Sequence, residues 1–407
     1  MNVLCKTISV SAVISLLFFH APQSVVGQEN SSVSSAKQNN VFALELYAKL
    51  KDRSGNIFLS PYSISTALAM TYAGAKGETA VQIAQVFHFE ADQAKNNESF
   101  KKLQKMMNDI GAKGSFELNV ANALWAQNGY AFLPDYLKVV NEDYDAKAQE
   151  LDFKNAAEAS RRIINAWVEN KTNSRIQDLI PQGALTDLTR LVLTNAIYFK
   201  GKWESQFEKD MTKDAPFNLM DGAVCQVPMM NITKEFLFGE DADAQVLSIP
   251  YKGNDLSMII ILPKEKNGLS RIEKDINIDR VEGWLTASDF LRMREVIVSI
   301  PRFKITSEFE LANTLSSMGM PKAFNEADFS GMTGKKDLFI GAVIHKAFVD
   351  VNEEGTEAAA ATAVAMMESV NLVKETKFIA DHPFLYMIRD NNSGSILFMG
   401  RITDPLK

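Results

Sequence analysis

The chain has few cysteines and few histidines. Its 407 residues include two cysteines and four histidines, so a fold built on many disulfides is excluded and stability must come from a large hydrophobic core. The 21 glycines and 12 prolines are ordinary counts, which exclude collagen-like and low-complexity chains. Lys and Arg number 43 against 50 Asp and Glu, and this net charge of −7 argues against a nucleic-acid-binding surface.

Local motifs of metal binding and catalysis are also missing. His20, His88, His345 and His382 have no zinc-ligand spacing among themselves or with cysteine, so neither a metal nor another cofactor is expected. The chain has no Gly-x-Ser-x-Gly elbow, no Walker loop and no Gly-x-Gly-x-x-Gly. A Ser-His-Asp triad assembled from distant residues stays open, and with it the minor alternative of a secreted hydrolase.

A weak basic cluster consists of Lys101, Lys102 and Lys105, with Lys113 beyond. This spacing is better explained by one solvated face of a helix than by a binding site for a polyanion. Polyanion binding is therefore not part of the expected function.

The first residues have the features of a targeting segment. Lys6 precedes a short apolar run over residues 8–19, and small residues follow up to Gly27. This order is typical of a secretory signal peptide, so we predict cleavage after Gly27 and a secreted, extracellular protein. The alternative is a membrane anchor, but twelve helical residues span about 18 Å and a hydrocarbon core about 30 Å. No later apolar run approaches 18 residues, so the mature chain is expected to lie outside membranes.

Removal of residues 1–27 takes Cys5 away and leaves Cys225 as the single cysteine. Its neighbours alternate between apolar and polar residues as in a strand, which predicts a buried, unreactive thiol. Residues 28–40 are polar and rich in serine, and we expect them to form a flexible lead-in.

Residues 41–407 are predicted to form one α+β domain. Apolar spacing predicts helices at 41–50, 61–75, 79–87, 97–110 and 156–171, and Ser60-Pro61 is a typical start for the second of these. Strands dominate the second half, at 245–250, 256–262, 296–300, 342–351 and 396–400. No repeat or linker divides this body, so we expect one large core.

The most unusual stretch begins at Glu353, in the sequence EEGTEAAAATAVA. Propensity alone favours a helix here, but the stretch continues directly from the strand-like Val349–Val351. On an extended strand, every second residue from Thr356 to Val364 shares one face, and all of these are small or β-branched and uncharged. Such a segment could enter a sheet between two strands without burying a charge, while Glu357 begins the opposite face and stays in water.

Five motifs, in the family's order, make the chain resemble a serpin. They are Phe58–Ser65, Asn195–Trp203, Ile344–Ala347, Glu353–Ala361 and Ala380–Phe384. The resemblance implies one domain of three β-sheets and eight or nine helices, with an exposed reactive loop at about residues 353–380. It also implies a suicide inhibitor of serine proteases, with papain-like cysteine proteases as an added target class. We expect the protein to be a monomer. In this mechanism the protease cleaves the loop, which inserts into the main sheet before the acyl-enzyme is hydrolysed.

The resemblance also assigns roles to residues. The start of the reactive loop is the hinge, comprising Glu353, Gly355, Thr356, Glu357, Ala358, Ala359, Ala360 and Ala361. A polar cluster that must rearrange when the sheet opens comprises Ser60, Ser63, Asn195 and His345, together with Trp203, which would lie where insertion begins. For Ser60 a plain helix cap is an equal alternative, and for His345 a satisfied core histidine.

The cleaved bond follows from the family's spacing. Counting seventeen residues from Glu353 gives Ser369–Val370, and a count one shorter gives Glu368–Ser369. Met367 and Met366 are further alternatives, because they would suit a protease with an apolar pocket. A small or apolar residue at the cut implies an elastase-like or subtilisin-like target. The rival function is a non-inhibitory carrier or decoy substrate, which the small residues of the hinge disfavour.

Overall fold

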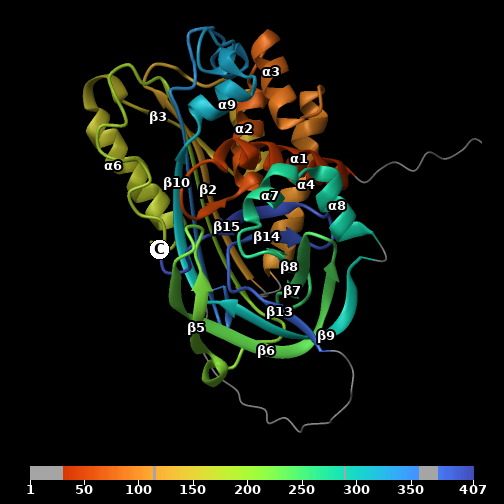
Figure 1. The fold of residues 1–407 in the computed structure, drawn as a ribbon. Coiled ribbons are helices and arrows are strands. Elements are labelled where there is room, and N and C mark those ends of the chain that lie inside the picture. Colours follow the sequence, from red (N-terminus) through yellow and green to blue (C-terminus); the bar gives the residue numbers. More distant parts are fainter. Residues whose placement is uncertain (1–30, 113–115, 288–289, 357–374) are drawn as a thin grey trace, which may run out of the picture.

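The computed structural model describes residues 31–112, 116–287, 290–356 and 375–407 (Figure 1). These residues form ten α-helices and two short 3₁₀ turns. The helices are α1 (Ser31–Leu50), α2 (Pro61–Ala73), α3 (Gly77–Phe87), α4 (Gln93–Ala112), α5 (Pro134–Tyr144), α6 (Phe153–Lys171), α7 (Leu269–Asp275), α8 (Ile278–Thr286), α9 (Ala312–Met318) and α10 (Ser330–Thr333), and the turns are η1 (Lys209–Met211) and η2 (Pro321–Ala323).

A six-stranded sheet holds the candidate site. Its order is β10 (Phe303–Glu310), β11 (Ala342–Asn352), β12 (Gly355–Thr356), β4 (Leu191–Lys202), β2 (Phe116–Gln127) and β3 (Lys147–Leu151). β4 and β11 run parallel and pair directly over residues 192–198 and 342–348. Only past this stretch does the two-residue β12 lie between them.

The second sheet has nine strands. Its order is β1 (Ile57–Leu59), β15 (Ile396–Ile402), β14 (Phe384–Asp390), β8 (Leu256–Pro263), β7 (Ala244–Pro250), β6 (Val224–Glu240), β9 (Arg292–Pro301) and β13 (Thr376–Ile379), while β5 (Lys213–Asn218) pairs with β6. The 17-residue β6 bonds to β5 at one end, β7 at the other and β9 along its middle. The resemblance implied three sheets in all. Because β6 is continuous, its hydrogen bonds join two of them into this one nine-stranded sheet. The α+β class is confirmed.

The two faces of the six-stranded sheet are covered by different elements (Figure 1). On one face α6 packs Ile164 and Val168 into a cluster with Tyr198 and Phe348. On the other face α2 lies in the main core together with residues of β4 and β11. β4 and β11 are therefore buried on both faces, which explains their nearly continuous apolar sequences.

Two segments that were predicted to lie outside the regular structure belong to it in part. Helix α1 begins at Ser31, so most of the predicted flexible lead-in is helical. Asn39 is 3% exposed, and its amide donates to the Ile396 carbonyl of β15 at 2.9 Å, which holds this part of α1 against the core. At the far end of the predicted reactive loop, residues 376–379 form β13, which pairs with β9.

Cys225 is half-buried rather than fully buried, and it packs against the apolar cluster that contains Val227. Burial still raises the pKa of the Cys225 thiol, and the nearby Asp404 carboxylate adds to this. None of the described helices combines the length and the apolarity that a membrane span requires.

Candidate functional site

The first part of the predicted hinge already lies in the six-stranded sheet. Gly355 and Thr356 form β12, which pairs antiparallel with β11 on one side and with β4 on the other. Thr356 pairs with Val351 of β11 and with Gly201 of β4. A strand that continued from Thr356 would have to separate β4 from β11, because these two strands pair directly beyond this point.

Gly355 is required by its surroundings. Its φ of +147° lies in a region that residues with a side chain rarely adopt. A Cβ on Gly355 would also stand only 2.1 Å from the carbonyl oxygen of Gly201. The close approach of β12 to β4 therefore depends on a glycine at position 355.

Thr356 is fully buried beside an aromatic stack. Its hydroxyl lies 3.0 Å from the hydroxyl of Tyr251, so the two form a hydrogen bond. The Tyr251 ring stacks on Trp203 with 4.6 Å between ring centroids. Burial raises the pKa of Tyr251, which keeps the phenol neutral. The pocket around Thr356 is thus apolar, with one polar partner that suits a hydroxyl.

Two buried carboxylates fix the turn that leads into β12. Glu354 is 4% exposed and forms an ion pair with Lys209 at 2.6 Å. The carboxylate of Glu353 accepts from the Thr212 hydroxyl at 2.8 Å and lies 3.6 Å from Arg302. The backbone is held as well, because the amide of Trp203 donates to the Glu354 carbonyl at 3.0 Å. These contacts keep the entrance to β12 in one arrangement.

A second polar group lies further along β4 and β11, where the two strands are still paired. His345 and Asn195 are direct neighbours in the register, and His345 Nδ1 hydrogen-bonds to Asn195 Oδ1. The Asn195 amide donates at 2.6 Å both to the Ser63 hydroxyl and to Asn122 Oδ1. On the other side of the ring, the amide of Ser60 donates to His345 Nε2 at 3.1 Å. These five residues, which we call the shutter cluster, tie β4, β11, β2 and α2 together.

The shutter cluster holds His345 neutral. The amide of Ser60 can only donate, so His345 Nε2 must accept and Nδ1 carries the proton that Asn195 receives. Desolvation in this fully buried site lowers the pKa of the imidazole to about 3. A second proton would have to displace the hydrogen bond from Ser60.

We expect this histidine to make stability fall below about pH 6.5. Between its ordinary pKa of 6.5 and the folded value of about 3, the unfolded chain binds a proton that the folded chain does not. Stability is therefore full above pH 6.5 and is lost progressively as the pH falls toward 3, by up to about 1.4 kcal/mol per pH unit. Denaturant unfolding at pH 7.5 and 5.5 measures this loss, which should shrink in His345→Gln and persist in the control His88→Gln at the rim of α3. An equal loss in the two variants would contradict the assignment.

The structure corrects and extends the predicted cluster. Ser60, Ser63, Asn195 and His345 come together as expected, but Trp203 lies apart from them, beside β12. Asn122 of β2 was missed, although a lone polar side chain in the apolar run Ala121–Ala126 is itself a sign of a buried network.

Both alternatives for Ser60 hold in the structure. Its hydroxyl accepts from the Ser63 amide at 3.1 Å as a helix cap, and its backbone amide bonds His345 within the shutter cluster. The remaining predicted site residues, from Glu357 to Ala361 and from Met366 to Val370, lie outside the described residues.

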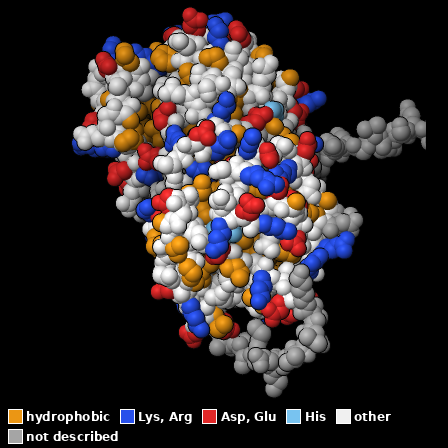
Figure 2. Space-filling view, in the orientation of Figure 1, with side chains coloured by type: hydrophobic (Ala, Val, Ile, Leu, Met, Phe, Trp, Pro, Cys, Tyr) orange, Lys and Arg blue, Asp and Glu red, His pale blue; other side chains and the backbone are white. Residues whose placement is uncertain are grey.

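The three lysines of the basic cluster that lie in the described residues are exposed and paired with carboxylates. On α4, Lys101 pairs with Asp143 at 2.9 Å, and Lys102 and Lys105 pair with carboxylates of the same helix. The face seen in Figure 2 likewise has Lys and Arg interspersed with Asp and Glu. The predicted solvated face of this helix is confirmed. In the same described ranges, no group of three or more His, Cys, Asp or Glu is placed to hold a metal ion.

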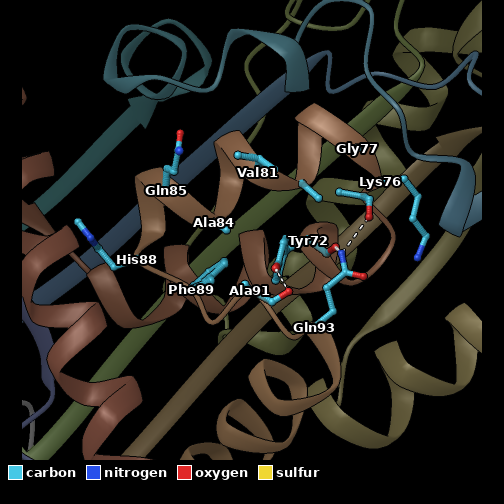
Figure 3. Close-up of a pocket in the computed structure, with 12 residues that line it drawn as sticks. Tyr72, Lys76, Gly77, Val81, Ala84, Gln85, His88, Phe89, Ala91 and Gln93 are labelled. Atoms are coloured by element: carbon cyan, nitrogen blue, oxygen red, sulfur yellow. Dashed lines mark hydrogen bonds between the residues drawn. The ribbon is translucent and has the colours of Figure 1, made fainter.

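An open hollow of about 690 Å³ lies between α2, α3 and the start of α4 (Figure 3). Val81 of α3 lines it together with small residues, and the Gln93 amide bonds the Ala75 carbonyl at 2.9 Å. The described lining includes His88 but neither a Ser or Cys nucleophile nor a carboxylate. This hollow therefore lacks the groups that a hydrolase needs.

The comparisons with known proteins agree with this architecture. The sequence model of the family described as "Serpin (serine protease inhibitor)" matches residues 37–405. The leukocyte elastase inhibitor of Bos taurus is 44% identical over 376 residues, which cover 90% of this chain and 98% of the relative. Serpin B3 of Homo sapiens is 41% identical over 391 residues, covering 91% of this chain and all of that protein. The crystal structure of Serpin48 from the insect Tenebrio molitor superposes with a TM-score of 0.82 at 33% identity, covering 93% of this chain and 99% of that one. The chain belongs to the serpin family.

Proposed function

We propose that this protein is a secreted inhibitor of serine proteases, which traps its target by inserting the cleaved reactive loop between β4 and β11. The observation that carries the proposal is β12, a two-residue strand already seated between these two strands. Membership of a family described as serine protease inhibitors supports the activity. Relatives named leukocyte elastase inhibitors support an elastase-like target.

The chemistry is supplied by the protease. Its serine Oγ attacks the carbonyl carbon of Ser369, and the serine proton passes through the protease histidine to the leaving amine of Val370. The peptide bond is broken, and Ser369 is held to the protease as an ester. The chain from Thr356 to Ser369 is then free to move at one end, with the protease attached to it.

The register of β12 dictates how the freed chain would insert. Continued past Thr356, the strand would place Ala358 between Val349 of β11 and Phe199 of β4. Val349 and Phe199 belong to one apolar cluster, so this face of the new strand would enter a dry core. Small side chains meet no clash there, and each buried CH₂ group contributes about 0.8 kcal/mol.

The opposite face of the inserted strand would meet α6. Ala359 would lie between Phe348 and Tyr198, beneath Ile164 and Val168 of α6. A larger side chain at this position would displace the helix. The run of alanines thus suits a space that is limited on both faces of the sheet.

Insertion has one identifiable barrier. The direct pairing of β4 with β11 must break, and so must the hydrogen bond between His345 and Asn195. In the inserted strand Thr362 would lie between these two residues, where its hydroxyl can replace part of the hydrogen bonding that they lose. The polar network holds the sheet closed until cleavage supplies a strand, so the native state is kinetically trapped.

The proposal has three further parts. The protein is a secreted monomer, it is cleaved at Ser369–Val370, and its target is an elastase-like or subtilisin-like protease. Incubation with proteases of these two classes should give a covalent complex that survives SDS denaturation, and mass spectrometry of the released C-terminal peptide locates the cleaved bond. If a broad panel, papain-like enzymes included, gave only cleaved protein and fully active protease, the carrier or decoy function would be favoured instead.

A further inference from the structure

Five Asn-x-Ser/Thr sequences occur in the chain, at Asn30, Asn97, Asn170, Asn231 and Asn391. Such a sequence accepts an N-linked glycan on the Asn Nδ2 when the chain enters a secretory pathway. The folded protein must then accommodate the glycan, so the side chain has to be exposed and its amide free of contacts that the fold requires. Asn30 lies outside the described residues, and the structure tests the other four.

Three of these four side chains are committed to the fold. Asn97 is 8% exposed, and its Oδ1 accepts from the Tyr144 hydroxyl at 2.8 Å. The Nδ2 of Asn231 donates to the carbonyl oxygens of Met211 and Met229, at 2.9 and 3.0 Å.

The third committed side chain is Asn391. Its Nδ2 donates to the Asn254 carbonyl at 2.8 Å and to the Ser257 hydroxyl at 2.9 Å. A glycan on Asn97 would have to displace the core, and a glycan on Asn231 or Asn391 would break hydrogen bonds that join separate segments.

Asn170 is placed differently. It is exposed, in the last turn of α6, four residues after the exposed Ala166. The packed face of this helix carries Ile164 and Val168, which lie against the sheet. With 3.6 residues per turn, Ala166 and Asn170 share the opposite, solvent-facing side. The structure continues in an exposed turn at residues 173–174, so the surroundings are open as well.

We propose that Asn170 is an N-glycosylation site, and that Asn97, Asn231 and Asn391 are not. This inference rests on the secretion proposed above. The glycan would point away from the six-stranded sheet, so β4 and β11 could still separate beneath α6. Glycosylation and protease trapping are therefore compatible in one molecule.

The test is expression of the full chain with its own N-terminus in a eukaryotic secretory host. Protein from the medium is treated with a peptide N-glycosidase in H₂¹⁸O, which converts each occupied Asn to a labelled Asp, and the peptides are mapped by mass spectrometry. We expect label at Asn170 and none at Asn97, Asn231 or Asn391.

Two variants give matched controls for this assignment. Asn170→Gln should lose one glycan, whereas Ala166→Gln, which places the same new side chain one turn earlier on the exposed side of α6, should keep it. Complex formation with protease should stay within twofold in both variants, because neither position contacts β4 or β11.

Two outcomes would overturn the inference: secreted protein without label at Asn170, or label at any of the three committed asparagines. Retention of the chain inside the cells would argue against secretion, not against the site. In that case the leader is replaced by an established signal peptide, and occupancy of Asn170 in the secreted product decides the question.

Discussion

Replacing Thr356 by arginine should convert the inhibitor into a substrate. Thr356 is fully buried in β12 beside Tyr251, in a pocket with one polar partner. A guanidinium there would be buried without a counter-charge, at a cost of several kcal/mol. Because β12 has only two residues, we expect the body to fold without it and the cleaved loop to insert too slowly to trap the protease. Each 1.4 kcal/mol of added barrier slows insertion about tenfold, and the yield of SDS-stable complex should fall at least tenfold while cleavage continues.

The matched control is Thr356→Ser, which keeps the hydroxyl that bonds to Tyr251. This variant should form complex close to the level of the unchanged protein. Densitometry of complex and cleaved bands at several ratios of inhibitor to protease gives the partition directly. If Thr356→Arg formed the covalent complex normally, trapping would not require residue 356 to be buried between β4 and β11.

Replacing Ser369 by arginine should redirect the inhibitor toward trypsin-like proteases. These enzymes have an acidic specificity pocket that binds Arg or Lys, whereas the unchanged protein has a small neutral residue, Ser369, at the predicted cleavage site. We expect the second-order rate constant of inhibition to rise at least tenfold for a trypsin-type enzyme and to fall by a similar factor for an elastase-type enzyme. Progress curves with a chromogenic substrate measure both constants.

Met367→Arg is the matched variant for the position of the cut. If Ser369–Val370 is the cleaved bond, arginine at Met367 lies outside the main specificity pocket and should change trypsin inhibition little. A larger gain from Met367→Arg than from Ser369→Arg would move the reactive bond by two residues toward the hinge.

The elements that carry the site were predictable because each has a local signal. Ser60-Pro61 starts α2 where expected, and the apolar run from Leu191 gives the buried β4. The glycine at 355 marks the bend that enters β12, and the structure supplies the reason, a positive φ against the Gly201 carbonyl. Periodicity and turn chemistry act over a few residues, so one sequence is enough to read them.

The features that were not predicted are contacts between residues that lie far apart in the sequence. Trp203 was grouped with His345, yet the two lie at different points along the six-stranded sheet, one beside β12 and one in the shutter cluster. The sequence around Glu354 has no local sign of burial, and only the fold brings Lys209 to within 2.6 Å of it. The partner of this buried carboxylate lies 145 residues away, so no local pattern predicts the pair.

The number of sheets shows the same limit. Nothing in the sequence of β6 says that one strand will bond to three others along its length. Register and partner choice are set by tertiary packing. The start of α1 was missed for the same reason. Asn39 lies in a polar stretch of sequence, and only the fold brings its amide to the Ile396 carbonyl.

The central claim is that the cleaved reactive loop becomes a strand between β4 and β11. Nicking the chain within residues 357–374, removing the protease and measuring thermal unfolding tests this claim directly. Insertion would add a full strand to the six-stranded sheet, and a more stable folded state unfolds at a higher temperature. We predict that the midpoint of the cleaved protein lies more than about 10 °C above that of the intact protein. An unchanged or lower midpoint after complete cleavage would contradict the account.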